Sequence, residues 1–282
     1  MTSLNRKTAS FTTQENRTSL QDPVKRYFSK MIDSGFFYEH FPKLFVALIL
    51  TFVSGLVDII GYLGIYHFFT AHLTGTTVQL GRGLASRNWM HASLAAAIVG
   101  AFFAASVLAR ALIEIASRRH FRRIASITLI IEAVCLVAVA VEHFSSRGKP
   151  YWSIAVLAAA MGIQTATLTG IGPLTIHTTF VTGMLNKLGQ LSSHIGFRAY
   201  DLRHRNSANL EMHCNQKRDV QMALFLVAIW LFYVAGAILG TWSFFSWGLR
   251  ALFIAVGLLA LSLATDQFWP IAIQEEKEQS ES

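Results

Sequence analysis

Charged residues are scarce in this sequence: Asp, Glu, Lys and Arg make up only 14% of its 282 residues, against about 25% in an average soluble domain. Cysteine is also rare, with only 2 residues, which excludes a secreted scaffold built on disulfides. Phosphate-binding loops, nucleophile elbows and HExxH zinc motifs are missing as well. We therefore do not expect a soluble domain or an enzyme, and we expect no metal and no cofactor.

Long apolar runs are what the sequence has instead. Hydrophobic residues make up 53% of the chain and gather into blocks. These blocks are roughly Leu44–Tyr66, Ala92–Ile113, Ile124–Val141, Trp152–Gly172, Val220–Trp242 and Trp247–Phe268. Each is close to the ~20 residues that a helix needs to cross a hydrocarbon core ~30 Å thick. The sequence thus predicts an all-α integral membrane protein with six transmembrane helices.

The net charge of +8 is distributed unevenly between the two sides that this topology defines. Most of the 24 lysines and arginines precede the first block, follow the second, or lie between the fourth and fifth. The positive-inside rule therefore places both termini in the cytoplasm. Because these basic residues flank apolar blocks and form no stripe on a soluble surface, we expect the lipid bilayer, not nucleic acid, as the partner.

The segments outside the blocks are polar. Residues 1–22 have the composition of a disordered cytoplasmic tail, and 270–282 form an acidic tail. Residues 23–43 are basic and aromatic, which suits either an interfacial helix on anionic lipid or an ordinary linker. Residues 198–219 are polar and are expected to form a cytoplasmic loop.

An internal repeat divides the chain. Thr74-Gly75 and Leu80-Gly81 recur, at the same spacing, as Thr182-Gly183 and Leu188-Gly189. We therefore predict two three-helix repeats, 44–143 and 144–269, each with a broken or re-entrant segment after its first helix. Because each repeat has an odd number of spans, the second enters the membrane from the opposite face, as in many transporters with inverted topology.

Small residues four apart occur in the second span of each predicted repeat. Gly100 and Ala104 lie in one of these spans, and Gly236 and Gly240 lie in the other. Such pairs allow two membrane helices to approach closely. Both pairs are therefore predicted to face the interior of the bundle.

Two acidic residues lie deep within apolar blocks, Asp58 in the first and Glu132 in the third. A charged carboxylate at the centre of a membrane helix costs about 2.5–3.5 kcal/mol on insertion scales, so such residues usually face a cavity or a partner. Each is a candidate for proton coupling. The alternative is a neutral, hydrogen-bonded acid that holds two helices together.

Other polar residues cluster around the repeated elements. Gln164 and Thr165 lie in the fourth block, and the Thr-Gly pairs at 74–75 and 182–183 could present hydroxyls or backbone N–H groups to a solute. Close helix packing would favour the same small residues, and the two interpretations are equally open. His72 adjoins the first pair and titrates near neutral pH, although a histidine at this place is more often merely interfacial.

Four short segments together resemble the YoaK-type membrane family, a bacterial group that carries a domain of unknown function. They are Gly55–Asp58, Leu73–Thr76, Met161–Gln164 and Phe180–Gly183. The resemblance extends over roughly Leu44–Phe268 and implies a multispan protein of the bacterial inner membrane, without implying a substrate. This chain has Thr165 where the family usually has Asn, which argues against a role that needs a carboxamide there.

These patterns favour a small-solute or ion transporter, with an intramembrane carboxylate as the candidate for proton coupling and the pathway between the two halves. The residues expected to line this pathway are Asp58, Thr74, Gly75, Glu132, Gln164, Thr165, Thr182 and Gly183. The alternative function is a membrane scaffold that transports nothing and uses these polar residues only to fix its helices.

Overall fold

A computed structural model describes residues 41–65, 67–119, 123–142, 150–167, 170–171, 174–175, 181–204 and 210–268. The predicted tails, 1–22 and 270–282, lie outside the described residues, as does nearly all of the predicted interfacial segment 23–43. Within these ranges the regular secondary structure is helical except for one two-residue β ladder between Gly170–Ile171 and Leu174–Thr175. The expectation of an all-α protein was therefore correct apart from this ladder.

Each of the six apolar blocks coincides with a helix. The helices are α3 (Phe41–Gly64), α5 (Trp89–Arg118), α6 (Ile124–Glu142), α7 (Pro150–Thr167), α9 (Leu210–Trp247) and α10 (Leu252–Phe268), with the 3₁₀ turn η2 (Gly248–Ala251) between the last two. Among the described residues, four stretches are long and apolar enough to cross a membrane: Phe41–Gly64, Trp89–Arg118, Ala125–Glu142 and Arg218–Phe268. The last of these contains both the apolar part of α9 and all of α10.

A non-helical segment follows the first helix of each half. After α3 ends at Gly64, the next helix is α4 (Leu73–Ala85); after α7 come β1 and β2, then α8 (Val181–His204). Both Thr-Gly pairs therefore lie in the first turn of a helix. With 13 residues, α4 extends only ~20 Å and is too short to span a bilayer.

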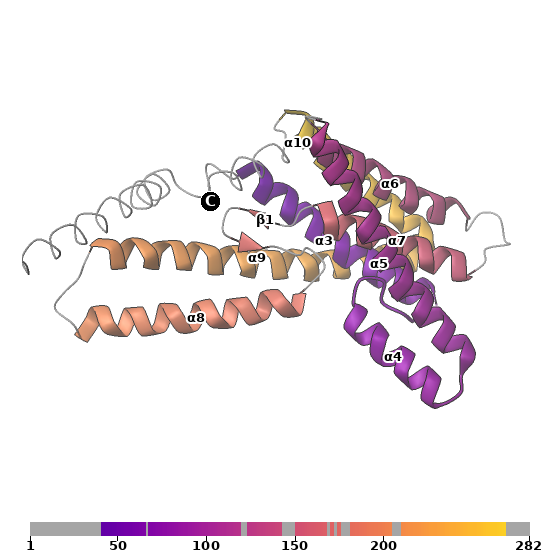
Figure 1. The fold of residues 1–282 in the computed structure, drawn as a ribbon, viewed down its shortest axis with the longest axis horizontal. Coiled ribbons are helices and arrows are strands. Elements are labelled where there is room, and N and C mark those ends of the chain that lie inside the picture. Colours follow the sequence, from indigo (N-terminus) through magenta and orange to yellow (C-terminus); the bar gives the residue numbers. More distant parts are fainter. Residues whose placement is uncertain are drawn as a thin grey trace, which may run out of the picture.

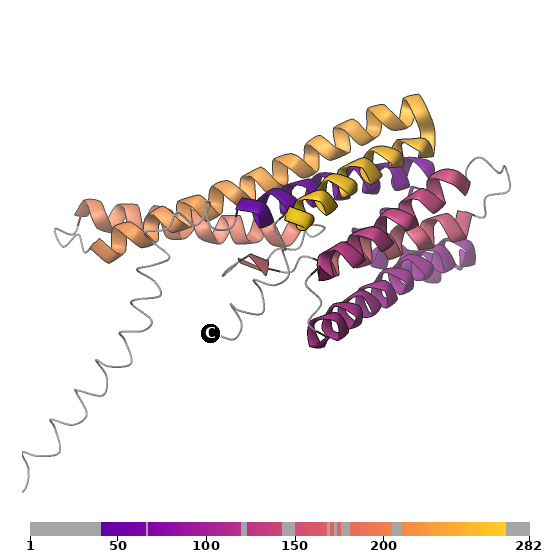
Figure 2. The ribbon, with the colours of Figure 1, turned by 90° about the horizontal axis from the view of Figure 1, so that it is seen from above.

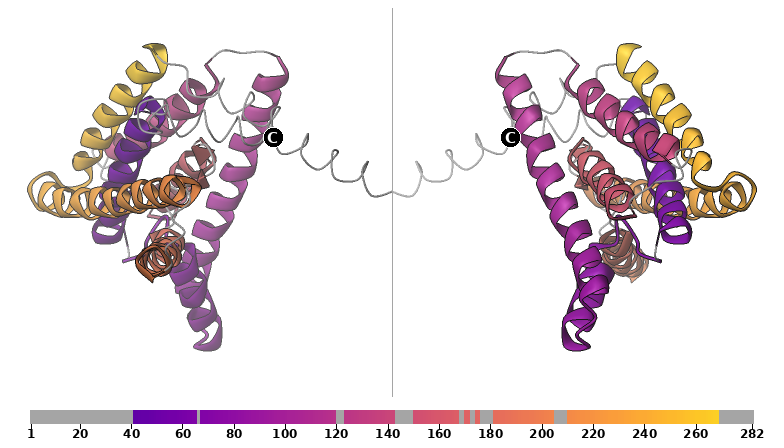
Figure 3. Two further views of the ribbon diagram at one scale, coloured as in Figure 1. Left: turned by 90° about the vertical axis from the view of Figure 1, so that its left-hand side faces the viewer. Right: turned by 90° about the vertical axis from the view of Figure 1, so that its right-hand side faces the viewer.

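The two halves interlock. Helix α3 packs along α9, and α7 packs along α5, so the first helix of each half lies against the long helix of the other. Helix α4 packs on α5 and α8 packs on α9, while α10 contacts α6 and α3. Figures 1 and 2 show that α8 and the N-terminal part of α9 project together away from the remaining helices. In Figure 3, α8 is seen nearly end-on, whereas α9 runs across the view.

Glycines bring the interlocked backbones into contact. A Cβ added to Gly55 would lie 2.2 Å from the Tyr233 carbonyl oxygen, and one added to Gly236 would lie equally tightly against the backbone of Phe52. A Cβ on Gly162 would lie 2.4 Å from the carbonyl oxygen of Phe102. The α3–α9 and α5–α7 interfaces are thus both built on direct backbone approach, as expected where small residues drive packing.

The small-residue prediction is confirmed on α9 and wrong on α5. A Cβ on Gly240 would lie 2.5 Å from Ile59, so this glycine does face α3. Gly100 is exposed, with nothing within 4 Å of an added Cβ. The small pair that packs on α7 is Ala105 with Ala109, both buried, because the side of α5 that faces α7 is rotated away from Gly100.

The polar stretch 198–219, expected to be a loop, is helical over most of its length. Helix α8 continues to His204 and α9 begins at Leu210. An ion pair of 2.5 Å between Arg198 and Asp219 joins the two helices, and Met184, near the start of α8, is buried. Tertiary packing between α8 and α9 therefore stabilises helices that the polar composition does not predict.

Substituting Ala for Gly55 should destabilise the fold, because the new methyl group would overlap the α9 backbone. Overpacking of this kind costs about 1–3 kcal/mol. The effect is measured as the thermal midpoint of unfolding in detergent, with size-exclusion chromatography as the readout of folded protein. The matched control is Gly100→Ala, which should be neutral or stabilising because its site is open. Equal midpoints for the two variants would contradict the close approach.

Candidate functional site

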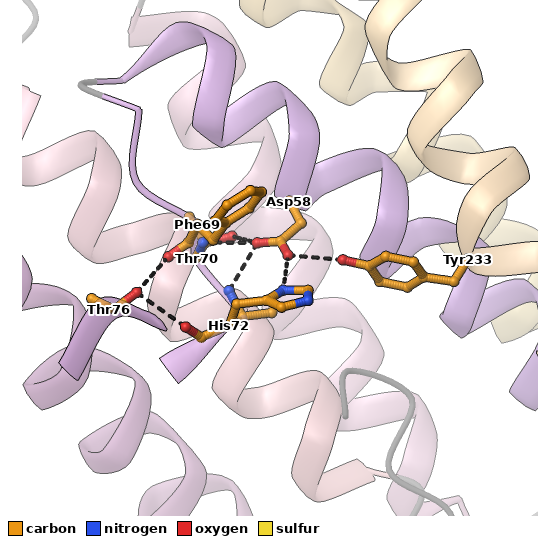
Figure 4. A network of polar contacts seen from close by, with 7 residues as sticks. Asp58, Phe69, Thr70, His72, Thr76 and Tyr233 are labelled. Carbon is orange, nitrogen blue, oxygen red and sulfur yellow. Dashed lines mark hydrogen bonds and ion pairs between the residues drawn. The ribbon is translucent and has the colours of Figure 1, made fainter. Parts of the chain in front are cut away.

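Asp58, in the last third of α3, is the centre of a polar cluster. Its Oδ1 accepts hydrogen bonds from the backbone N–H of Thr70 at 2.8 Å, from the Thr70 hydroxyl at 3.1 Å and from the Ala71 N–H at 2.9 Å. Its Oδ2 accepts a hydrogen bond from the Tyr233 hydroxyl at 2.9 Å and lies 2.6 Å from His72 Nδ1. Asp58 is only 1% exposed. Figure 4 shows α3, the segment before α4 and α9 converging on this one carboxylate.

The cluster exists because the chain leaves the helix after Gly64. Non-helical backbone leaves N–H groups without an intrahelical acceptor, and each one buried without a partner is costly. Asp58 supplies that acceptor for Thr70 and Ala71. The Thr76 hydroxyl also bonds to this segment, at 3.2 Å from the carbonyl oxygens of both Phe69 and His72.

His72 connects the buried carboxylate to the surface of the protein. Its side chain is 37% exposed, while that of Asp58 is 1% exposed. The hydrogen bond to Asp58 raises the pKa of His72 above its ordinary value, although partial burial opposes the shift. The histidine lies between α3 and α4, outside the four candidate spans. It is therefore placed to pass a proton between the exterior and Asp58.

Gln164 links α7 to α3 at Leu50, which precedes Asp58 on α3 by about two turns. It is fully buried, and its Nε2 donates to the carbonyl oxygen of Leu50 at 2.5 Å. The Ser54 hydroxyl donates to the same oxygen at 3.0 Å. The Gln164 Oε1 has no hydrogen-bond partner among the described residues.

Glu132 has a very different environment from Asp58. It is fully buried in α6, and neither carboxyl oxygen has a hydrogen-bond partner within the described part of the chain. Helix α6 packs against α7 and α10. A carboxylate in such surroundings, with no partner, would retain its charge only at a cost of several kcal/mol, so it is expected to be neutral.

The remaining predicted residues lie outside the Asp58 cluster. Thr74 and Gly75 are exposed on α4, and Thr182 is exposed on α8. Gly183 and Thr165 are partly buried, and the Thr165 hydroxyl donates to the Met161 carbonyl at 2.8 Å. The structure thus brings Asp58 together with His72, and Gln164 with α3, but leaves the first Thr-Gly pair on the outer side of α4.

Among the described residues, the second half has no equivalent of the Asp58 carboxylate and its Tyr233 partner. Gly162 contacts the backbone of Phe102 as Gly55 contacts that of Tyr233, which aligns the two interfaces. In this alignment Thr165 takes the position of Asp58, and Phe102, without a hydroxyl, takes that of Tyr233. The acid and its hydroxyl partner are therefore specific to one of two otherwise similar interfaces.

Sequence reasoning missed two members of the cluster, Tyr233 and Thr70. A tyrosine near the centre of an apolar span was a usable signal, because a buried phenol usually has a hydrogen-bond partner. Nothing in the sequence indicates that this partner is Asp58. Among the described residues, no three His, Cys, Asp or Glu side chains are grouped so as to hold a metal ion.

Apolar helices, close glycine contacts and an intramembrane carboxylate cluster define a helical integral membrane protein. More particularly, the chain belongs to the family described as protein of unknown function (DUF1275), whose model matches residues 46–265. It is 32% identical over 143 residues to the UPF0700 transmembrane protein YoaK of Bacillus subtilis (strain 168). That match covers 50% of this chain and 63% of the relative. No solved structure matches the chain.

The His72–Asp58 pair should make stability depend on pH. Because the folded-state pKa of His72 is raised, the pair stabilises the fold fully below the ordinary histidine pKa of ~6.5. This contribution is lost as pH rises through the higher folded-state pKa. The thermal midpoint in detergent should fall over that range. In His72→Gln this decline should be reduced, whereas His91→Gln, at an exposed histidine, should retain it.

Glu132→Met should maintain or raise the thermal midpoint. An unsatisfied buried polar group costs about 1–3 kcal/mol, and an apolar side chain of similar length removes that cost. The comparison is with Asp58→Met, which removes the acceptor for several buried donors and should lower the midpoint. If Glu132→Met were as destabilising as Asp58→Met, Glu132 would have a polar partner.

Proposed function

We propose that this protein is a transporter of a small solute or ion in the bacterial inner membrane, coupled to protons through Asp58. In this proposal six helices span the bilayer as two inverted repeats, and both termini are cytoplasmic. The solute and the bilayer are its partners, with no nucleic acid and no enzymatic activity. The interlocked contacts support the repeat, because α3 on α9 and α7 on α5 are equivalent pairs.

The observation that carries this proposal is the position of one carboxylate between three elements. A single group, Asp58, bonds to α3's own following segment and to Tyr233 of α9. A proton added to this carboxylate occupies one of its oxygens and weakens its role as an acceptor. The change would loosen the 70–72 segment and the contact with α9 together. Proton binding is thereby coupled to the relation between the two halves.

The proposed pathway runs between the halves beside this cluster. Gln164, whose buried Oε1 has no hydrogen-bond partner in the described part of the chain, and Thr165 would contribute from α7. The first turns of α4 and α8, with Thr74, Gly75, Thr182 and Gly183, would contribute at its ends, where helix N-termini favour anionic groups. Glu132 is a second titratable carboxyl in the same bundle.

Proton movement in liposomes tests the proposal. Full-length protein is reconstituted with an entrapped pH-sensitive dye, and amino acids, sugars, organic acids and monovalent cations are added one class at a time. One class should produce a pH change that protein-free liposomes do not show. Asp58→Asn should abolish this change, and His72→Gln should slow it about tenfold or more, in the range of positioned acid–base groups.

The control for this experiment is Glu114→Gln. Glu114 is an exposed carboxylate that pairs with Arg118 at 2.9 Å on α5. The Asp58 cluster is built from other elements, namely α3, the segment before α4 and α9. It should leave the pH change intact. The folding of Asp58→Asn is checked by chromatography. If the folded variant still produced the wild-type pH change, Asp58 would have no part in the mechanism.

The second candidate function, a scaffold that transports nothing, is favoured by the location of the first Thr-Gly pair. Thr74 and Gly75 are exposed on α4, and every oxygen of Asp58 already has a partner. In that case all solute classes would leave the internal pH unchanged, while Asp58→Asn would still lower the thermal midpoint.

A further inference from the structure

A small apolar cavity lies at the end of α5, where this helix passes α6. Its volume is about 140 Å³. The residues that line it are Leu112, Ile113, Ile115, Ala116, Arg119, Ile127 and Thr128. A dry apolar cavity of ~150 Å³ holds a molecule the size of benzene, so this one accepts a short piece of hydrocarbon chain.

The exposure of its apolar lining residues shows that the cavity is open to the outer surface of the bundle. Ile115 is 53% exposed and Ile127 is 38% exposed, although both are large apolar residues. Leu112, one turn before Ala116, is also exposed. In a helix that is apolar enough to span a membrane, an exposed apolar wall of this kind contacts acyl chains.

Positive charge adjoins the apolar wall at the end of the span. Arg119 lines the cavity, directly after the last residue of α5. Within the described ranges, no carboxylate lies at ion-pair distance from Arg119. The neighbouring Glu114 pairs with Arg118. Arg123 is exposed nearby along the chain and adds to the positive potential. Basic pockets between helices at a membrane interface are typical binding sites for anionic headgroups.

We propose that this cavity binds an anionic phospholipid, with part of one acyl chain against the apolar wall and the phosphate on Arg119. The combination of features identifies the occupant. A free phosphate would not use the five apolar residues among the lining, and a neutral lipid would not use the guanidinium. This site is separate from the Asp58 cluster, and the proposal does not depend on transport.

Native mass spectrometry of the full-length protein in detergent, with phosphatidylglycerol and phosphatidylcholine of the same chains added, tests the proposal. Phosphatidylglycerol should be retained more than phosphatidylcholine. Arg119→Gln should lower its retention about fivefold, the effect of one basic side chain near an anionic headgroup. Ala116→Phe, which fills the cavity, should lower the retention of both lipids.

The matched control is Arg118→Gln, which removes a neighbouring arginine that already has a partner and does not line the cavity. It should retain phosphatidylglycerol as the wild type does. Glycerol phosphate, which has no acyl chains, should not compete. Equal retention of the two lipids by the wild type, equal effects of the two arginine variants, or competition by glycerol phosphate would each overturn the proposal. Because Arg119 and Ala116 are tested separately, misfolding of one variant leaves the other informative.

Discussion

The structure depends on how a break in a membrane helix bundle satisfies its backbone. When α3 ends at Gly64, the following N–H groups lose their helical acceptors in a region with little water to replace them. Asp58 lies more than a turn before the end of the same helix. Its carboxylate accepts hydrogen bonds from the backbone N–H groups of Thr70 and Ala71. One side chain thereby makes the non-helical segment compatible with burial. It also fixes the direction in which α4 leaves.

The same carboxylate is bonded across the interface between the halves. Its contact with Tyr233 lies beside the place where Gly55 meets the α9 backbone. Glycines there allow the two helices to approach closely enough for a side chain on α3 to reach a hydroxyl on α9. Backbone approach and polar contact are therefore linked, because widening the interface would also break the hydrogen bond. The α5–α7 interface has the glycine but, with Phe102 and Thr165, lacks this polar link.

Apolar length and patterning were enough to predict the six helices that coincide with apolar blocks, and the burial of Asp58 and Glu132 followed from their position in these blocks. The partners of Asp58 could not be predicted, since Tyr233 is remote in sequence and joins it only through the packing of α3 on α9. The sequence also did not predict which face of each helix points into the bundle. Gly100 and Ala105 lie on the same span, and only the packing of the helices shows that Ala105 faces α7. The helical extent of α8 depends on its contacts with α9, which composition does not encode.

Asp58 and Glu132 are alike in sequence context and opposite in environment. Asp58 is held by hydrogen bonds from the segment before α4 and from α9, so a change in its protonation must act on backbone positions. Glu132 is surrounded by α6, α7 and α10 without a bonded partner among the described residues, so its protonation moves no contact of this kind. If protons drive a conformational change here, the physical means lies at Asp58. A carboxyl group can transmit its titration to the fold only through bonds that the titration alters.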